Sequence, residues 1–335
     1  MPSKVFTYYE PHTVLAEVNG ISLHKTPYQQ YGKFVSVYDE LPHSNCSIES
    51  WLEATYQAGL TAAKESLTDL DTTPVVSQPG FAMAFGDSRV PFVWLVRNNV
   101  GFAESAPIPP QSIWRARWKS AFRMTCGIVL EGTHYLGRCR RLLKAANGEE
   151  RGALVHTVRV PLREDMVNLG QSEFPRNFRY TEPLASVVAL PVPWKVGNVV
   201  EWMEATQLHF GWVWVTGNAS SNLVADVMRR SRIGVHLSAG ESLSLVTMEH
   251  LLFHPTFVLQ SDGYERNFGG YAVAVTSPAD LIEKSAHVME SAATWEDQVY
   301  RQRSYLYTTR SPGNFRIDMD AAVESIRSVY AQMRS

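Results

Sequence analysis

The sequence lacks most of the features that would assign it to a class. Only three of its 335 residues are cysteines, Cys46, Cys126 and Cys139, and none are spaced as CxxC. An odd number without that spacing excludes a disulfide framework and favours a reducing compartment inside the cell. No GxGxxG, GxxxxGKS/T or GxSxG stretch occurs. The sequence therefore predicts no dinucleotide fingerprint, no P-loop and no hydrolase elbow.

Long hydrophobic runs are missing too. The most apolar run, LASVVALPVPW, is far shorter than the roughly 20 residues that a membrane span needs, and the N-terminal MPSKVFTYYEPHT contains no apolar segment of a secretory signal. We therefore expect a cytoplasmic protein that does not interact with a membrane.

The composition is that of an ordered globular protein. Hydrophobic residues make up 45% of the chain and charged residues 19%, with a net charge of -2, whereas disorder requires few apolar residues and a high net charge. The length would allow two domains of about 150 residues. Because no linker or low-complexity seam is present, we expect a single elaborated domain over 1–335, with a possible C-terminal helical segment at 278–335.

Strand-like and helical segments are interleaved. Residues 47–67, 111–125 and 134–146 have helical spacing, and Ser47, Ser220 or Ser221, and Ser277 offer N-cap chemistry. Stretches rich in β-branched and aromatic residues predict strands. These stretches are 4–12, 13–25, 33–41, 80–86, 90–102, 153–162, 184–192, 211–217, 243–253 (equally a helix) and 270–277. We find no βαβ period, so the expected fold is α+β with a mainly antiparallel sheet, packed helices and inserted elements.

The charges are unevenly distributed. Residues 1–90 carry ten acidic and five basic side chains, whereas 115–163 carry eleven basic and three acidic ones. A basic region is the usual footprint of a polyanionic partner. A solvated helix face, or docking on an acidic neighbour, would explain the same pattern.

The basic region contains a helix with two distinct stripes. On a helix over 111–125, Arg115, Lys119 and Arg123 fall at i, i+4 and i+8. Trp114 and Trp118 lie on a neighbouring apolar stripe that would fix the helix to a sheet. Cations in such a line can follow a phosphate chain but cannot read bases. Similar roles are predicted for Arg138, Arg141, Arg229 and Arg230.

The stretch IPPQSIWRARWK, residues 108–119, resembles the RAMP superfamily of CRISPR effector proteins. In that superfamily an Ile-Pro turn opens a basic helix on an RRM-like sheet, and the matching positions here are Ile108, Pro109, Gln111, Ser112, Ile113 and Arg115. YERNFGGYAVAV, residues 264–275, is similar to the family's glycine-rich loop through Arg266, Gly269 and Gly270. Glycines there would let the backbone approach phosphates closely.

The resemblance implies a non-catalytic, multi-copy, RNA-binding backbone subunit of an antiviral ribonucleoprotein. Arg115, Lys119, Arg123 and the loop at Gly269 would then face RNA phosphates, beside other protein subunits, with no cofactor and no metal.

Two other classes remain open. One is a capsid-like or other homo-oligomeric assembly protein, in which the basic region meets an acidic neighbour. The other is an enzyme with a metal site at His250 and His254, which lie one turn apart if helical, although no third ligand is evident. Asp318 and Asp320 could hold a hard cation, but Asp320 is more simply the N-cap of the last helix.

Overall fold

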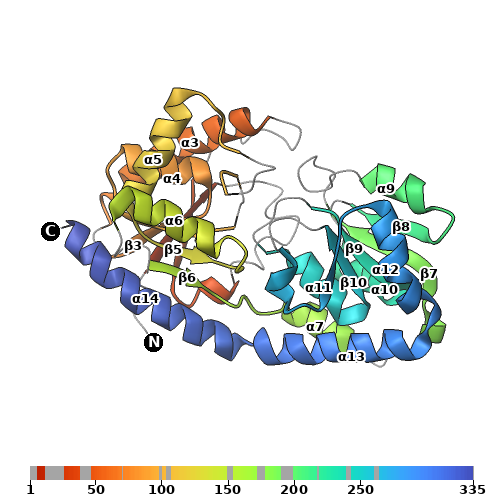
Figure 1. Ribbon diagram of the computed structural model, residues 1–335. Helices are drawn as coiled ribbons and strands as arrows, with labels where there is room; N and C mark the ends of the chain where they lie inside the picture. The colour runs from red at the N-terminus through yellow and green to blue at the C-terminus, as the bar shows by residue number, and fades with distance from the viewer. Residues whose placement is uncertain are drawn as a thin grey trace. The chain divides into compact units, whose positions relative to one another are not determined.

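Strands that run parallel to their neighbours form both sheets of the protein. The computed structural model describes residues 6–11, 26–37, 47–69, 71–97, 100–102, 107–148, 154–171, 178–189, 199–216, 219–238, 243–259 and 264–334. The chain divides into unit 1, Met1–Val160 with Pro312–Ser335, and unit 2, Pro161–Ser311. Each unit has its own sheet (Figure 1). That the two behave as one elaborated domain stays a prediction.

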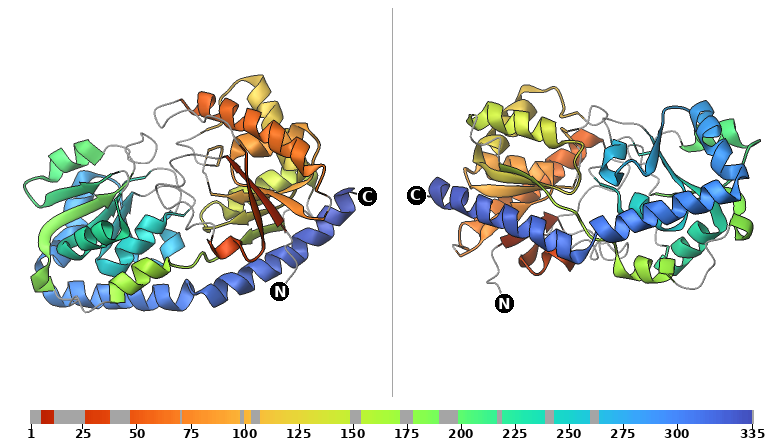
Figure 2. Two further views of the ribbon diagram at one scale, coloured as in Figure 1. Left: turned by 180° about the vertical axis from the view of Figure 1, so that it is seen from behind. Right: turned by 60° about the horizontal axis from the view of Figure 1, so that its bottom comes forward.

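The sheet of unit 1 has the order β2-β1-β3-β4-β5-β6, and all its pairings are parallel. Its strands are β1 (Phe6–Pro11), β2 (Gly32–Val37), β3 (Thr73–Val76), β4 (Phe92–Val96), β5 (Thr125–Leu130) and β6 (Val155–Thr157). β1 is visible in dark red from behind in Figure 2. The short strands β3 and β4 are buried throughout, as expected of a sheet covered on both faces.

Helices cover both faces of this sheet. α3 (Ile48–Ser66), α4 (Pro79–Asp87), α5 (Ser112–Met124) and α6 (Leu136–Asn147) each connect one strand to the next parallel one. Right-handed crossovers in one direction place their helices on the same face. α14 (Pro312–Arg334) packs on the other face, where Ile326 leaves no room for a side chain at position 127 of β5 (Figure 1). The short helix η1 (Thr26–Tyr28) precedes β2.

Aromatic side chains fill the core between α5 and the sheet. Trp94 of β4 lies 5.1 Å from Trp118 and 5.3 Å from Phe122, measured between ring centroids. Trp114 is 3% exposed and packs against Tyr56 of α3. The prediction that the tryptophans fix this basic helix to a sheet is confirmed for Trp118, whereas Trp114 packs on α3 instead.

The sheet of unit 2 has the order β11-β10-β9-β7-β8 and is also parallel. Its strands are β7 (Glu182–Val188), β8 (Gly211–Val215), β9 (Ser231–His236), β10 (Thr256–Leu259) and β11 (Ala272–Val275). The α-helices are α7 (Glu164–Gln171), α9 (Val199–Thr206), α10 (Ser221–Arg230), α11 (Leu245–Phe253), α12 (Pro278–Glu290) and α13 (Ala292–Thr309). Two short helices are η3 (Phe178–Tyr180) and η4 (Tyr264–Phe268). α9 and α12 share one apolar core with the sheet, and α7, α10 and α11 pack together.

The expected mainly antiparallel, RRM-like sheet is wrong, because every strand pairing among the described residues is parallel. Residues 80–86, expected to be a strand, lie in α4, and 243–253 contain α11. Both helices are buried on nearly all sides, so neither shows a polar face with helical spacing. β3 and β5 were not expected as strands, and with them and α4 in place the segment from β3 to β6 is a regular βαβ series. The strand expected at 13–25 lies outside the described residues.

None of the helices in the described ranges is long and apolar enough to cross a bilayer.

Candidate functional site

The strand order of unit 2 reverses between β7 and β9. After β7 the next strand, β8, is added at one edge of the sheet, whereas β9, β10 and β11 are added one after another on the opposite side of β7. Ligands of open α/β sheets bind outside the carboxyl ends of the strands at such a point. His236 ends β9 there, Ser238 follows it, and α11 begins after Ser244.

Polar groups surround the N-terminus of α11. The Ser244 hydroxyl accepts a hydrogen bond from the Thr247 amide at 3.2 Å, and the Ser244 amide donates to the Tyr264 hydroxyl at 3.0 Å. The ring of Tyr264 stacks on His236 at 5.9 Å. Ser238 is 3% exposed, and among described residues neither its hydroxyl nor that of Thr247 has a hydrogen-bond partner. A helix N-terminus with spare hydroxyl donors is suited to bind an anion.

Beneath this edge lies a buried pair of histidines. His254 Nε2 is 3.1 Å from Ser186 Oγ on β7 and 3.3 Å from His250 Nδ1. Both rings pack on Gly234 of β9, where a Cβ would overlap them. Burial lowers the pKa of His254 to about 3, and burial beside His254 and His236 lowers the pKa of His250 well below 6.5.

These histidines do not form the metal site that the sequence left open as an alternative. No group of three or more histidine, cysteine or acidic side chains that could hold a metal ion occurs in the described part of the chain. Glu249 does not join the two histidines, since its carboxylate forms an ion pair with Arg163, whose Nη1 lies 3.0 Å away. Arg163 also contacts Asp165 at 2.7 Å. Burial raises the pKa of Glu249 to about 7, although Arg163 opposes the shift.

In unit 1, charged side chains meet at the carboxyl ends of two central strands. Arg97 follows β4 and Glu131 follows β5. Glu131 Oε1 accepts from Arg97 Nε at 3.0 Å and from the Tyr28 hydroxyl at 2.9 Å, and the guanidinium lies 4.9 Å from the Tyr28 ring. Burial, followed by the Glu131 charge, raises the pKa of Tyr28 well above 10.

Sequence reasoning missed this Arg97–Glu131–Tyr28 cluster. A signal was present, since each charged residue directly follows a fully apolar run, FVWLV before Arg97 and the end of TCGIVL before Glu131. Neither run was read as a parallel strand, so their carboxyl ends were not expected to meet.

The acidic pair near the C-terminus has a structural role. Asp318 accepts two bonds from the Arg159 guanidinium, at 2.7 and 2.8 Å, and one from its amide at 2.9 Å. Asp320 accepts from the Tyr31 hydroxyl at 3.0 Å. α14 begins at Pro312, so the expectation that Asp320 caps the last helix is wrong.

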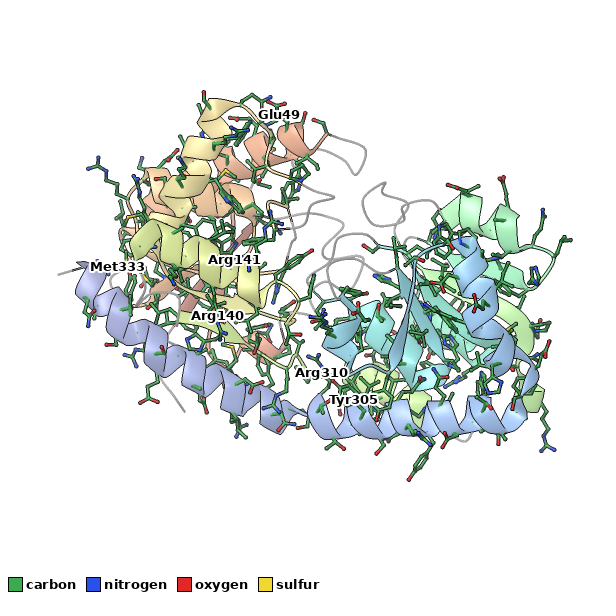
Figure 3. The ribbon with its side chains drawn as sticks, viewed as in Figure 1. Glu49, Arg140, Arg141, Tyr305, Arg310 and Met333 are labelled. Carbon is green, nitrogen blue, oxygen red and sulfur yellow. The ribbon has the colours of Figure 1, made fainter. Side chains whose placement is uncertain are left out.

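The cations predicted to bind a polyanion are divided between the units. In unit 1, Arg115, Lys119 and Arg123 are exposed on α5, Arg141 is exposed on α6 and Arg138 is half-buried there. Figure 3 marks Arg141 on α6, next to Arg140.

In unit 2, Arg229 donates to the Leu169 carbonyl and Arg230 pairs with Glu182. Arg266 is exposed on η4. Gly269 and Gly270 have φ of 63° and 81°, and a Cβ on Gly269 would lie 2.6 Å from the ring of Tyr305, which Figure 3 labels on α13. The glycines are therefore required by the turn and by packing. Anion binding by any of these residues stays a prediction.

Comparison with proteins of known structure identifies the fold. No family model and no curated protein sequence matches the chain. The structure is similar to alpha,alpha-trehalose 6-phosphate synthase from Burkholderia multivorans, at 11% identity over 98% of this chain and 99% of that one, with a TM-score of 0.62. It is also similar to the UDP-forming alpha,alpha-trehalose-phosphate synthase from Burkholderia xenovorans in complex with glucose-6-phosphate. That match has 10% identity over 96% of this chain and 100% of that one, with a TM-score of 0.67. The chain has the GT-B glycosyltransferase fold. A TarM variant of S. aureus, in complex with fondaparinux, alpha-GlcNAc-glycerol and UDP, matches at 9% identity over 82% and 58%, with a TM-score of 0.56.

The GT-B fold overturns the resemblance to the RAMP superfamily. The resemblance rested on two short motifs, which lie here in the helix of a βαβ unit and in a turn before the edge strand β11. The non-catalytic RNA-binding subunit, its ribonucleoprotein setting and its RNA and protein partners are therefore wrong, and the capsid-like alternative has no support.

Proposed function

We propose that the protein is a cytoplasmic glycosyltransferase that moves a sugar from a nucleoside diphosphate to a hydroxyl group of a phosphorylated sugar. The observation that carries this proposal is the similarity of the fold over 96–99% of the chain to trehalose-phosphate synthases. Two of these are described as UDP-forming, and one of the two is in complex with glucose-6-phosphate.

The N-terminus of α11 is the proposed site of the donor diphosphate. In the reaction, the bond between the anomeric carbon and the diphosphate oxygen breaks, its electron pair leaves with the diphosphate, and the acceptor oxygen forms the new bond and loses its proton. Negative charge thus grows on the diphosphate. The helix dipole and the Ser238 and Thr247 hydroxyls would stabilise that charge.

The Arg97–Glu131–Tyr28 cluster is the proposed acceptor-binding element of unit 1. Its carboxylate already accepts two bonds through Oε1, which leaves Oε2 to accept from a sugar hydroxyl. Arg97 holds the carboxylate in position through its 3.0 Å contact with Oε1.

Calorimetric titration with UDP, ADP and GDP tests the donor site. We expect one of them to bind, and Ser238→Ala to weaken it roughly tenfold or more, since one bond to a charged group is lost. Ser328→Ala, an exposed serine of α14, is the matched control and should bind as the wild type does. If no nucleoside diphosphate binds at millimolar concentration, the proposal is wrong.

A second assay tests the transfer itself. The protein is incubated with the UDP-, ADP- and GDP-glucose donors and glucose 6-phosphate, and released nucleoside diphosphate and product mass are measured. We expect Glu131→Gln to reduce turnover while nucleotide binding is retained, because the two clusters lie in different units. An equal loss of turnover and of nucleotide binding in Glu131→Gln would contradict the assignment of Glu131 to the acceptor site.

A further inference from the structure

The outward faces of α5 and α6 form a strongly basic surface that the proposed function does not use. The two helices pack side by side on unit 1 and together contain eight basic and no acidic residues. We call the exposed cations the α5–α6 surface. Its members are Arg115, Lys119, Arg123, Arg140, Arg141 and Lys144. Figure 3 shows Arg140 and Arg141 on α6.

Five of these cations form no ion pair with any described residue: Arg115, Lys119, Arg123, Arg140 and Arg141. Elsewhere some exposed cations are paired, as Arg230 is with Glu182 and Arg301 with Asp297, whereas others such as Arg89 and Arg327 are single and not clustered. Even on α5, the inward-turned Arg117 pairs with Glu53 and stacks on an aromatic ring.

This arrangement does not serve the stability of the fold. Arg115, Lys119 and Arg123 follow one another at i+4 spacing, as do Arg140 and Lys144, and like charges so placed repel. An external anion would remove this cost.

The shape of the surface points to a flat partner. α5 is about 20 Å long, and packed helices lie about 8–10 Å apart, so the cations form a two-dimensional array rather than the lining of a pocket. Ile113, 53% exposed in the first turn of α5, adds an apolar side chain at the edge of the surface nearest α3, beside Glu49 and Glu53. Cations with an exposed aliphatic group are the chemistry of binding to a membrane interface.

We propose that the α5–α6 surface binds the anionic phosphate headgroups of a lipid leaflet. This departs from the sequence-based expectation of no membrane interaction, which rested on the lack of an apolar spanning segment and not on surface charge. The net charge of the chain is -2, so the attraction is local to this surface. Each cation near an anionic leaflet strengthens binding about fivefold. The inference does not depend on the proposed glycosyl transfer, because binding to vesicles requires no substrate.

Sedimentation with vesicles tests this inference. The full chain is mixed with vesicles of phosphatidylcholine alone or with 30% phosphatidylglycerol, at low and high salt. We expect salt-sensitive binding to the anionic vesicles only. The R115Q/K119Q/R123Q variant should bind on the order of 100-fold more weakly, because three cations are lost. The control R230Q/R301Q/R327Q removes the same charge from exposed positions elsewhere and should bind like the wild type.

Three results would overturn the inference. They are no binding of the wild type to anionic vesicles, equal weakening by the two triple variants, and retention on nucleic acid or on an acidic protein without vesicle binding. Thermal unfolding and circular dichroism confirm that each variant is folded, and R140Q/R141Q, on the other helix, repeats the test independently.

Discussion

Lowering the pH from 7 to 5 should destabilise unit 2 through His250 and His254. Both rings are fully buried, and the pKa of His254 is lowered to about 3 from 6.5. The unfolded chain binds a proton below pH 6.5 and the folded chain does not, so stability is lost as the pH falls from 6.5 toward 3. For His254 the loss between pH 7 and 5 is about 2 kcal/mol, and for His250, whose pKa is also lowered, the direction is the same.

Glu249 opposes this effect. Its pKa is raised from 4.5 to about 7, so the folded chain takes up this proton before the unfolded chain does. The contribution of this carboxyl to the free energy of unfolding therefore grows as the pH falls from 7 toward 4.5, and it has grown by about 2 kcal/mol at pH 5. The wild-type pH dependence is a sum of opposite contributions, and only a comparison of variants isolates the histidines.

Urea unfolding at pH 7 and pH 5, followed by tryptophan fluorescence, measures the difference. His254→Gln removes the titration but keeps a polar atom for Ser186, so its loss of stability should be about 2 kcal/mol smaller than that of the wild type. His209→Gln, the same substitution at an exposed position, is the control for the change of side chain. The same pH dependence in His254→Gln and the wild type would refute the claim that burial keeps this ring neutral.

Two further predictions concern stability and need only thermal or urea unfolding. Gly234→Ala should lower the free energy of unfolding by about 3 kcal/mol, since the new Cβ would lie 2.5 Å from His250 Nδ1. Gly137→Ala in α6, where the nearest atom is 3.6 Å away, should raise it by up to about 1 kcal/mol. Equal effects of the two variants would contradict the packing of the histidines on Gly234. Arg97→Met leaves the buried Glu131 without its cation and should lower the free energy of unfolding by about 3 kcal/mol or more. Tyr28→Phe removes one hydrogen bond and should lower it by about 1 kcal/mol. A larger loss in Tyr28→Phe than in Arg97→Met would show that the ion pair does not hold the cluster.

Local chemistry was readable from the sequence. Ser47, Ser220 and Ser277 cap helices as predicted, because a cap depends only on residues within one turn. The stripes of α5 were predicted for the same reason, with Trp114 buried and Lys119 exposed.

The direction of the strands and the pairing of distant residues could not be predicted from the sequence. α4 is so completely buried that its composition resembles a strand, and β3 and β5 were not expected as strands, so the βαβ series was not recognised. Arg97 and Glu131 are 34 positions apart and meet only because β4 and β5 are neighbours in a parallel sheet. The spacing of His250 and His254 was noticed, but the contact of His254 with Ser186 depends on how α11 packs against β9.

Hydrogen exchange in the presence and absence of the tightest-binding nucleoside diphosphate tests the central claim most directly. The proposed donor site predicts slower exchange for amides of 243–250, at the N-terminus of α11, and unchanged exchange for α5 and α6. No nucleotide binding, or protection confined to segments other than 243–250, would contradict the claim that this edge of unit 2 holds the sugar donor.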